Sequence, residues 1–162
     1  KKARRGKDGI QCVKTIDFEG CSAVRCAIAV GDEVWTAEWG GKLLVRDREN
    51  VEKVKVELPS SCLVWCMVLV RTEPPLLWVG QERAGLPVYN AMTRELLCTL
   101  TGGHTGNVAA LTVVDGPNGR KIVWSASNDF SIRSWNVEHE RRKSGAIFPL
   151  GSLPMHVRRG LV

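Results

Sequence analysis

The chain has 162 residues, of which 44% are hydrophobic and 25% are charged, the usual composition of a globular domain. This composition excludes a collagen-like rod, a coiled coil and a disordered tail. The longest apolar run is 63–70, far shorter than the roughly 20 residues of a membrane-spanning helix. We therefore expect no membrane span and, since residues 1–20 are basic and polar, no secretory signal.

Short apolar runs, five to eight residues long in most cases, follow one another along the chain and are separated by turn residues. They are rich in Val, Ile, Leu, Trp and Thr, which favour strands, and none has a helical period. The breaks contain Gly-Asp, Gly-Gly, Pro-Pro or Asn-Gly, and such short connections predict antiparallel hairpins. The fold class is therefore all-β. The predicted strands are 11–18, 24–30, 34–39, 43–46, 51–58, 63–70, 76–80, 86–89, 95–100, 108–114, 121–127 and 131–137.

Two landmarks repeat with the same period. The first is a tryptophan that opens a matched stretch, at Trp35, Trp78 and Trp124. The second, further on in each stretch, is Arg46, Tyr89 and Trp135. Both series have spacings of 43 and 46 residues, which is typical of a four-stranded propeller blade.

The third of these stretches resembles the WD-repeat family of β-propellers. It has Gly103-His104, an apolar strand at 108–114 and WSASNDFSIRSWN at 124–136, where Asn136 stands in place of the family's Asp. The stretches at 34–47 and 76–90 have Arg46-Asp47 and Tyr89-Asn90 at the Trp-Asp position and lack the Gly-His. The resemblance implies a β-propeller fragment of four-stranded antiparallel blades, about three in number.

The resemblance also implies a domain organisation. A basic tail at 1–9 precedes an outer strand at 10–18 that completes another blade. Blade one is 19–59, blade two is 60–102 and blade three is 103–150, and 151–162 begins a further blade or forms a tail. Since closed propellers have about 4–8 blades, we expect the ring to be completed by the parent chain or by another chain.

In blade three, the resemblance implies a structural hydrogen-bond network of His104, Ser125, Asp129 and Trp135. These residue types also include those of a Ser/His/Asp catalytic triad. However, Ser125 falls inside a predicted interior strand, and no oxyanion-hole loop is apparent. We therefore expect no catalytic activity. The repeated tryptophans are expected to pack between adjacent sheets rather than to stack on nucleic-acid bases.

Cysteines and basic residues bear on compartment and partners. The six cysteines stand mostly within apolar runs without a zinc-ligand pattern, which favours buried thiols in the cytoplasm or nucleus and no metal or other cofactor. The net charge of +6 is concentrated at 1–7, 141–143 and 158–159. Such clusters fit solvated surface, although they leave a nucleic acid or phosphorylated ligand open as a partner.

The favoured function is a non-catalytic scaffold that binds other proteins, as the resemblance implies. One alternative is a regulatory or targeting propeller within a larger enzyme, such as an inositol-polyphosphate phosphatase. A second alternative is a nucleic-acid-associated propeller. The candidate partner-binding residues lie in the blade turns, except that Trp65 lies in a strand where the repeat does not explain it. They are Glu38, Trp39, Lys42, Trp65, Gln81, Arg83, Asn128 and Phe130.

Overall fold

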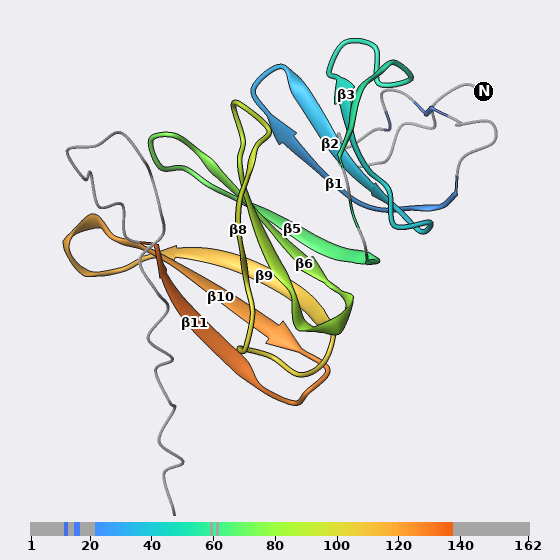
Figure 1. Cartoon of the computed structure of the whole chain (residues 1–162). Coiled ribbons are helices and arrows are strands. Elements are labelled where there is room, and N and C mark those ends of the chain that lie inside the picture. Colours follow the sequence, from blue (N-terminus) through green and yellow to red (C-terminus); the bar gives the residue numbers. More distant parts are fainter. Residues whose placement is uncertain (1–11, 13–14, 17–21, 59, 61, 138–162) are drawn as a thin grey trace, which may run out of the picture.

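The computed structural model describes residues 12, 15–16, 22–58, 60 and 62–137 of the chain. This part contains three antiparallel β-sheets that follow one another in sequence and lie side by side (Figure 1). Apart from two single 3₁₀ turns, at Glu82–Ala84 and Pro117–Gly119, the described residues contain no helix. The all-β prediction is confirmed.

Each sheet is built from consecutive strands in simple up-and-down order. The first has the order β1-β2-β3-β4 and contains Val24–Val30, Glu33–Glu38, Leu43–Asp47 and Val54–Leu58. The second has the order β5-β6-β7-β8 and contains Val64–Val70, Leu76–Gln81, Leu86–Asn90 and Leu96–Leu100. The third has the order β11-β10-β9 and contains Val108–Asp115 (β9), Lys121–Ser127 (β10) and Ile132–Val137 (β11).

The observed strands match the predicted runs closely, and the differences have local causes. The strand expected at 51–58 begins at Val54 because the Lys53 N–H bonds the carbonyl of Asn50 and closes a turn. Between β1 and β2, Gly31 adopts φ +56° in a two-residue turn, a conformation that glycine takes without strain. The strand expected at 10–18 and the last part of blade three, 138–150, lie largely or wholly outside the described residues.

Two apolar cores join the three sheets. The first, between the first and second sheets, is built around Trp35, Val45, Leu77, Val79 and Tyr89, all at most 2% exposed. The second, between the second and third sheets, is built around Trp78, Val88, Val108, Val123 and Trp135. Strand β6 contributes alternate side chains to both cores and is buried along its whole length.

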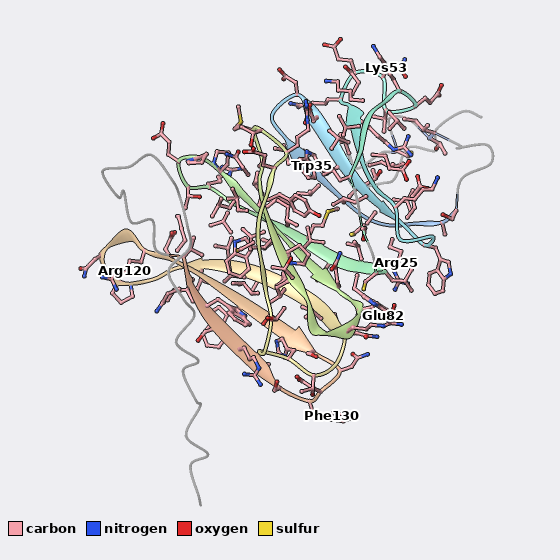
Figure 2. The ribbon with its side chains drawn as sticks, viewed as in Figure 1. Arg25, Trp35, Lys53, Glu82, Arg120 and Phe130 are labelled. Atoms are coloured by element: carbon pink, nitrogen blue, oxygen red, sulfur yellow. The ribbon has the colours of Figure 1, made fainter. Side chains whose placement is uncertain are left out.

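The two repeated landmarks meet across each core. Trp35 of the first sheet contacts Tyr89 of the second with ring centroids 6.1 Å apart (Figure 2). Trp78 of the second sheet contacts Trp135 of the third in the same way, at 6.4 Å. The same strand position thus packs against the next sheet each time, which explains the common period of the two series.

Trp124 departs from the expectation of core packing. It occupies the position of Trp35 and Trp78, but its side chain is 38% exposed. The reason is that Trp124 lies on the face of the third sheet that points away from the second. No further sheet covers that face within the described part of the chain.

Candidate functional site

One end of the three sheets, called the A face here, carries most of the candidate binding residues. It is formed by the starts of β1, β5 and β9 and by the turns 39–42, 82–85 and 128–131 (Figure 1). The opposite end, where the β7–β8 turn lies, is called the B face. In every blade, a backbone N–H just after the second strand bonds a carbonyl just before the first. These pairs are Trp39–Ala23, Glu82–Leu63 and Asn128–Asn107.

A chain of hydrogen bonds ties the A face of blade three to its core. The Trp135 Nε1–H donates to Ser125 Oγ at 2.8 Å, and Ser125 Oγ lies 2.7 Å from His104 Nε2. His104 Nδ1 lies 2.9 Å from Asp129 Oδ2. Because an ionised carboxylate only accepts, Nδ1 carries the proton and Nε2 accepts from the serine hydroxyl. The structure thus brings together the four residues of the expected network.

Asp129 ends this chain as a multiply bonded carboxylate. Burial raises its pKa, but hydrogen bonds from the Ser131 hydroxyl, the Thr105 N–H and His104 outweigh burial and hold the pKa of Asp129 well below its usual range. The Ser131 N–H adds a further bond at 3.0 Å. Asp129 therefore remains ionised and fixes the turn 128–131.

The network is built for rigidity rather than for catalysis. Ser125 is 1% exposed, and its oxygen already accepts the indole N–H of Trp135. A nucleophilic serine needs access to a substrate carbonyl and a free lone pair. The geometry therefore disfavours the triad interpretation of His104, Ser125 and Asp129.

Blade one contains a counterpart that was not anticipated from the sequence. Arg46, at the position of Trp135, donates from Nε to Thr36 Oγ1 at 3.0 Å, where Thr36 stands at the position of Ser125. The same guanidinium pairs with Glu38 Oε1 at 2.7 Å, and both side chains are buried. The carboxylate of Glu38, a candidate partner-binding residue, thus neutralises a buried arginine, and its contact with a partner stays a prediction.

Gln81, another candidate partner-binding residue, is also buried. Its side chain is only 6% exposed, and its Nε2 donates to Ser60 Oγ at 3.2 Å. The amide closes the end of β6 instead of facing solvent, and contact of Gln81 with a partner stays a prediction. Lys42, Arg83 and Asn128 are exposed at the A face.

Two aromatic side chains stand out from the A face. Trp39, in the β2–β3 turn, is 57% exposed, and Phe130, in the β10–β11 turn, is 102% exposed. Phe130 also adopts φ +63°, which is uncommon for a bulky residue. These turns are equivalent in blades one and three.

Trp65 lies beside the A face as part of an aromatic sandwich. The guanidinium of Arg25, at the start of β1, lies 3.7 Å from the centroid of the Trp65 ring and 4.5 Å from that of Trp39. A single cation thus joins an exposed and a partly buried indole from two adjacent blades. No pattern of residues pointed to Arg25, because the direction of its side chain depends on a strand irregularity.

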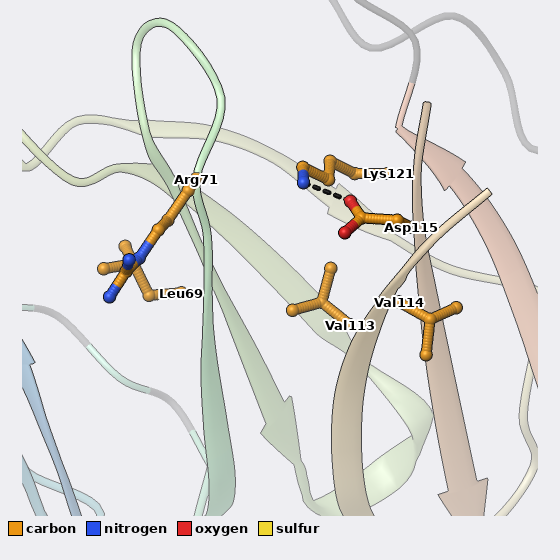
Figure 3. Close-up of a pocket in the computed structure, with 6 residues that line it drawn as sticks. All are labelled: Leu69, Arg71, Val113, Val114, Asp115 and Lys121. Carbon is orange, nitrogen blue, oxygen red and sulfur yellow. Dashed lines mark hydrogen bonds and ion pairs between the residues drawn. The ribbon is translucent and has the colours of Figure 1, made fainter. Parts of the chain in front are cut away.

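A small pocket lies between β5 and β9, toward the B face (Figure 3). It has a volume of about 140 Å³ and is lined by Leu69, Arg71, Val113, Val114, Asp115 and Lys121. Lys121 forms an ion pair with Asp115 and so satisfies its charge within the pocket wall. The pocket is too small for a drug-sized ligand, whose sites have volumes of about 300–1,000 Å³.

The thiols of Cys26, Cys66 and Cys98 are partly buried, which disfavours the reactive thiolate form. Burial raises the pKa of Cys66 to about 12, and it also raises the pKa values of Cys26 and Cys98. Within the described ranges, no three His, Cys, Asp or Glu side chains gather in a way that would hold a metal ion. The same part of the chain has no helix that is long and apolar enough to cross a membrane.

Comparison with known proteins bears on the family. No family model matches the chain. The Polycomb protein EED of Chaetomium thermophilum, a WD-repeat propeller, is 34% identical over 80 residues, which are 49% of this chain. In sequence and in blade geometry, the chain is similar to WD-repeat β-propellers. The match spans only 14% of that relative's length.

Three solved structures share the fold of the chain. U3-55K superposes with a TM-score of 0.62 and 21% identity, over 75% of this chain and 38% of its own. BBS1N, solved in complex with ARL6DN, gives a TM-score of 0.62 with 13% identity, over 82% and 41% of the two chains. The computationally designed Ika4 protein gives 0.58 with 20% identity, over 74% and 70%. At these identities, the likeness concerns the fold alone.

Proposed function

We propose that the chain is a non-catalytic scaffold that binds other proteins through its A face. Protein binding is the general role of WD-repeat propellers, and the similarity to EED supports it at the level of the family. The observation that carries the assignment to the A face is the pair of exposed aromatic side chains, Trp39 and Phe130, at equivalent turns of two blades. Exposed aromatic residues are enriched at the energetic centres of protein interfaces.

Phe130 gives a specific reason for a surface role. Its side chain is fully exposed, so it adds almost no buried area to the core, and its positive φ adds backbone strain. A residue that contributes little to folding and costs strain is better explained by contact with a partner. The hydrogen-bonded carboxylate of Asp129 next to it holds the turn in place, which lowers the entropy that binding would cost.

A reducing compartment, the cytoplasm or the nucleus, is part of the same proposal. Among the described cysteines, Cys26, Cys66 and Cys98 are free thiols. Free thiols are common in proteins of reducing compartments, whereas secreted domains tend to pair them.

Affinity capture tests the scaffold proposal. The tagged chain is incubated with nuclease-treated cell lysate at moderate salt, and captured proteins are identified by mass spectrometry. We expect the double variant Trp39→Ala/Phe130→Ala to lose proteins that the wild type retains.

Met92→Ala is the matched control, because Met92 is 68% exposed in the β7–β8 turn of the B face. It should retain the captured proteins. The proposal fails if the wild type captures no protein above the bare matrix, or if both variants retain the same set.

A further inference from the structure

The Arg25 side chain is held between two indoles that come from neighbouring blades. The planar guanidinium lies over the Trp65 ring at 3.7 Å and the Trp39 ring at 4.5 Å from the centroids. Stacking covers the faces of a guanidinium and leaves its edge, which carries the N–H donors, as the part that can bond a partner. Trp39 is 57% exposed, so this sandwich opens onto solvent at the A face.

A repeated irregularity of the innermost strands presents these side chains. In β1, the register with β2 shifts between Val24 and Cys26, which leaves Arg25 as the extra residue of a β-bulge. In β5, the register with β6 shifts between Val64 and Cys66, which leaves Trp65 in the same situation. Bulges redirect a side chain and are enriched next to functional sites. Arg25 and Trp65 are therefore placed together by equivalent features of two blades.

Two donors of the sandwich lack acceptors. Among the described residues, neither Arg25 Nη1 nor Trp65 Nε1 has a hydrogen-bond partner, although both atoms are buried. A desolvated donor without an acceptor costs free energy, and the cost is larger for a charged group. Both atoms are shielded from solvent, so an acceptor reaches them only if the side chains that cover them move. Arg25 as a whole is partly exposed, so its other N–H groups are the candidates for a bond to a partner.

The charges around the sandwich indicate which charge a bound ligand would carry. At the A face of blades one and two, Arg25 is accompanied by the exposed cations Lys42 and Arg83. Glu82 is the one partly exposed carboxylate among the described residues of these turns, since Glu38 is buried against Arg46. The cations are in excess, so the surface is complementary to an anionic ligand.

We propose that the Arg25–Trp39–Trp65 cluster binds an acidic segment of a partner protein. An Asp or Glu carboxylate of that segment accepts two parallel hydrogen bonds from the edge of the guanidinium, and an adjacent apolar side chain rests on the exposed ring of Trp39. This inference rests on the proposed scaffold function and names the chemistry of the partner.

A defined peptide tests the inference. The probe is a fluorescein-labelled hexapeptide of alternating Glu and Leu, compared by fluorescence anisotropy with its Gln-and-Leu counterpart. We expect the full chain to bind the Glu peptide and to bind the Gln peptide at least about tenfold more weakly, because a charge-assisted bidentate pair is lost. Arg25→Ala should weaken binding of the Glu peptide by a similar factor, and Trp39→Ala by several-fold.

Arg71→Ala is the matched control. It removes the same charge as Arg25→Ala, but Arg71 directly follows the opposite end of β5. It should change the affinity by less than about twofold. Melting curves check each variant. If Arg25→Ala melts early, Arg25→Lys keeps the charge without the fork and should still weaken binding several-fold.

Four results would overturn the inference: no binding of the Glu peptide to the wild type, equal binding of the Gln peptide, equal losses in Arg25→Ala and Arg71→Ala, or unchanged affinity in a folded Arg25 variant. The lysate experiment separates this failure from that of the scaffold proposal. If Arg25→Ala captures the same proteins as the wild type, the acidic-segment inference falls while the scaffold remains. If the wild type captures nothing, the scaffold itself falls.

Discussion

Blades one and three form the same buried hydrogen bond with different residues. In blade three, an indole N–H from Trp135 donates to the hydroxyl of Ser125. In blade one, a guanidinium N–H from Arg46 donates to the hydroxyl of Thr36. The indole is neutral, whereas the guanidinium brings a charge into the interior, and Glu38 compensates it. The charge at one position of blade one is therefore balanced by the opposite charge at a second position.

The network of blade three makes stability depend on pH in a specific way. The pKa of Asp129 is lower in the folded protein than the ordinary value near 3.9, so the carboxylate stabilises the fold above about pH 4. That contribution is lost as the pH falls further. We expect Asp129→Ala to lower the free energy of unfolding by about 1–3 kcal/mol at pH 7. The difference from wild type should shrink between about pH 5 and pH 2, as measured by urea denaturation.

Asp115→Ala is the control for this prediction. Asp115 pairs with Lys121 at a side chain that is 74% exposed, so its removal should change the free energy of unfolding by less than about 0.5 kcal/mol. A deficit of Asp129→Ala that stayed constant from pH 7 to pH 2 would contradict the assigned role of the carboxylate.

Side-chain roles were predictable only where the motif specifies them. The resemblance to the WD-repeat motif implied the network of His104, Ser125 and Asp129, because that motif specifies both the residue types and their spacing. Glu38 looked like an exposed turn residue, since nothing local shows that Arg46 turns inward. Arg25 was missed because a bulge depends on pairing between strands, which one strand's sequence does not reveal.

At the level of the elements, turn chemistry and apolar runs predicted nearly every strand. The ranges of β1 and β10 were predicted to the residue, since Gly31-Asp32 limits the first and Asn128-Asp129 limits the second. Which face of each strand would be covered was harder to predict. Trp124 has the same local pattern as Trp78, and its exposure depends on a neighbouring sheet rather than on its own strand.

At Gly80, the second and third blades approach each other closely. A Cβ at this position would lie 2.4 Å from Cys66 Sγ and 3.0 Å from the backbone oxygen of Val108, which belongs to the next blade. The equivalent positions in the other two blades hold Ala37 and Ala126. Blade two therefore leaves less room at this position than a methyl group needs.

We expect Gly80→Ala to destabilise the protein by about 1–3 kcal/mol, because the added methyl group must displace Cys66 and part of the β9 backbone. Thermal and urea unfolding would measure the change. Gly85→Ala is the control, since its Cβ would lie 3.4 Å from the nearest atom, in ordinary contact. Equal stability of the two variants would show that the blades can move apart at no cost.

For the whole molecule, the exposed face of the third sheet is the main apolar surface that no other sheet of the described residues covers. Trp124, Ile132 and Val114 lie on it with exposed fractions of 38%, 61% and 43%. Paired residues of neighbouring strands share a face of a sheet, and so do residues two apart along one strand. Trp124 pairs with Thr112 and Ser134, which lie two residues from Val114 and Ile132, and Val114 itself pairs with Ile122. In the other two sheets, the equivalent face is covered by the next blade.

We expect the isolated 162-residue chain to self-associate through this face, because a second copy is the only protein present that could cover it. Light scattering coupled to size-exclusion chromatography should show a mass that rises with concentration. Trp124→Lys should shift the distribution toward monomer, while Met92→Lys on the B face should not. A monodisperse wild-type monomer at all concentrations would contradict the expectation.

The complete burial of β6 has a consequence for how this strand finds its alignment. In a strand with one polar face, a slip by one residue is disfavoured because it moves apolar side chains into solvent and polar ones into the core. In β6, the side chains on both faces of the strand are buried in a core. A slip by one residue would turn Leu77 and Val79 toward the core that now holds Trp78, without exposing any apolar side chain to solvent. Only shape distinguishes the two alignments: the size of the Trp78 ring and the lack of a side chain at Gly80. The alignment of this strand is therefore set by side-chain volume rather than by polarity.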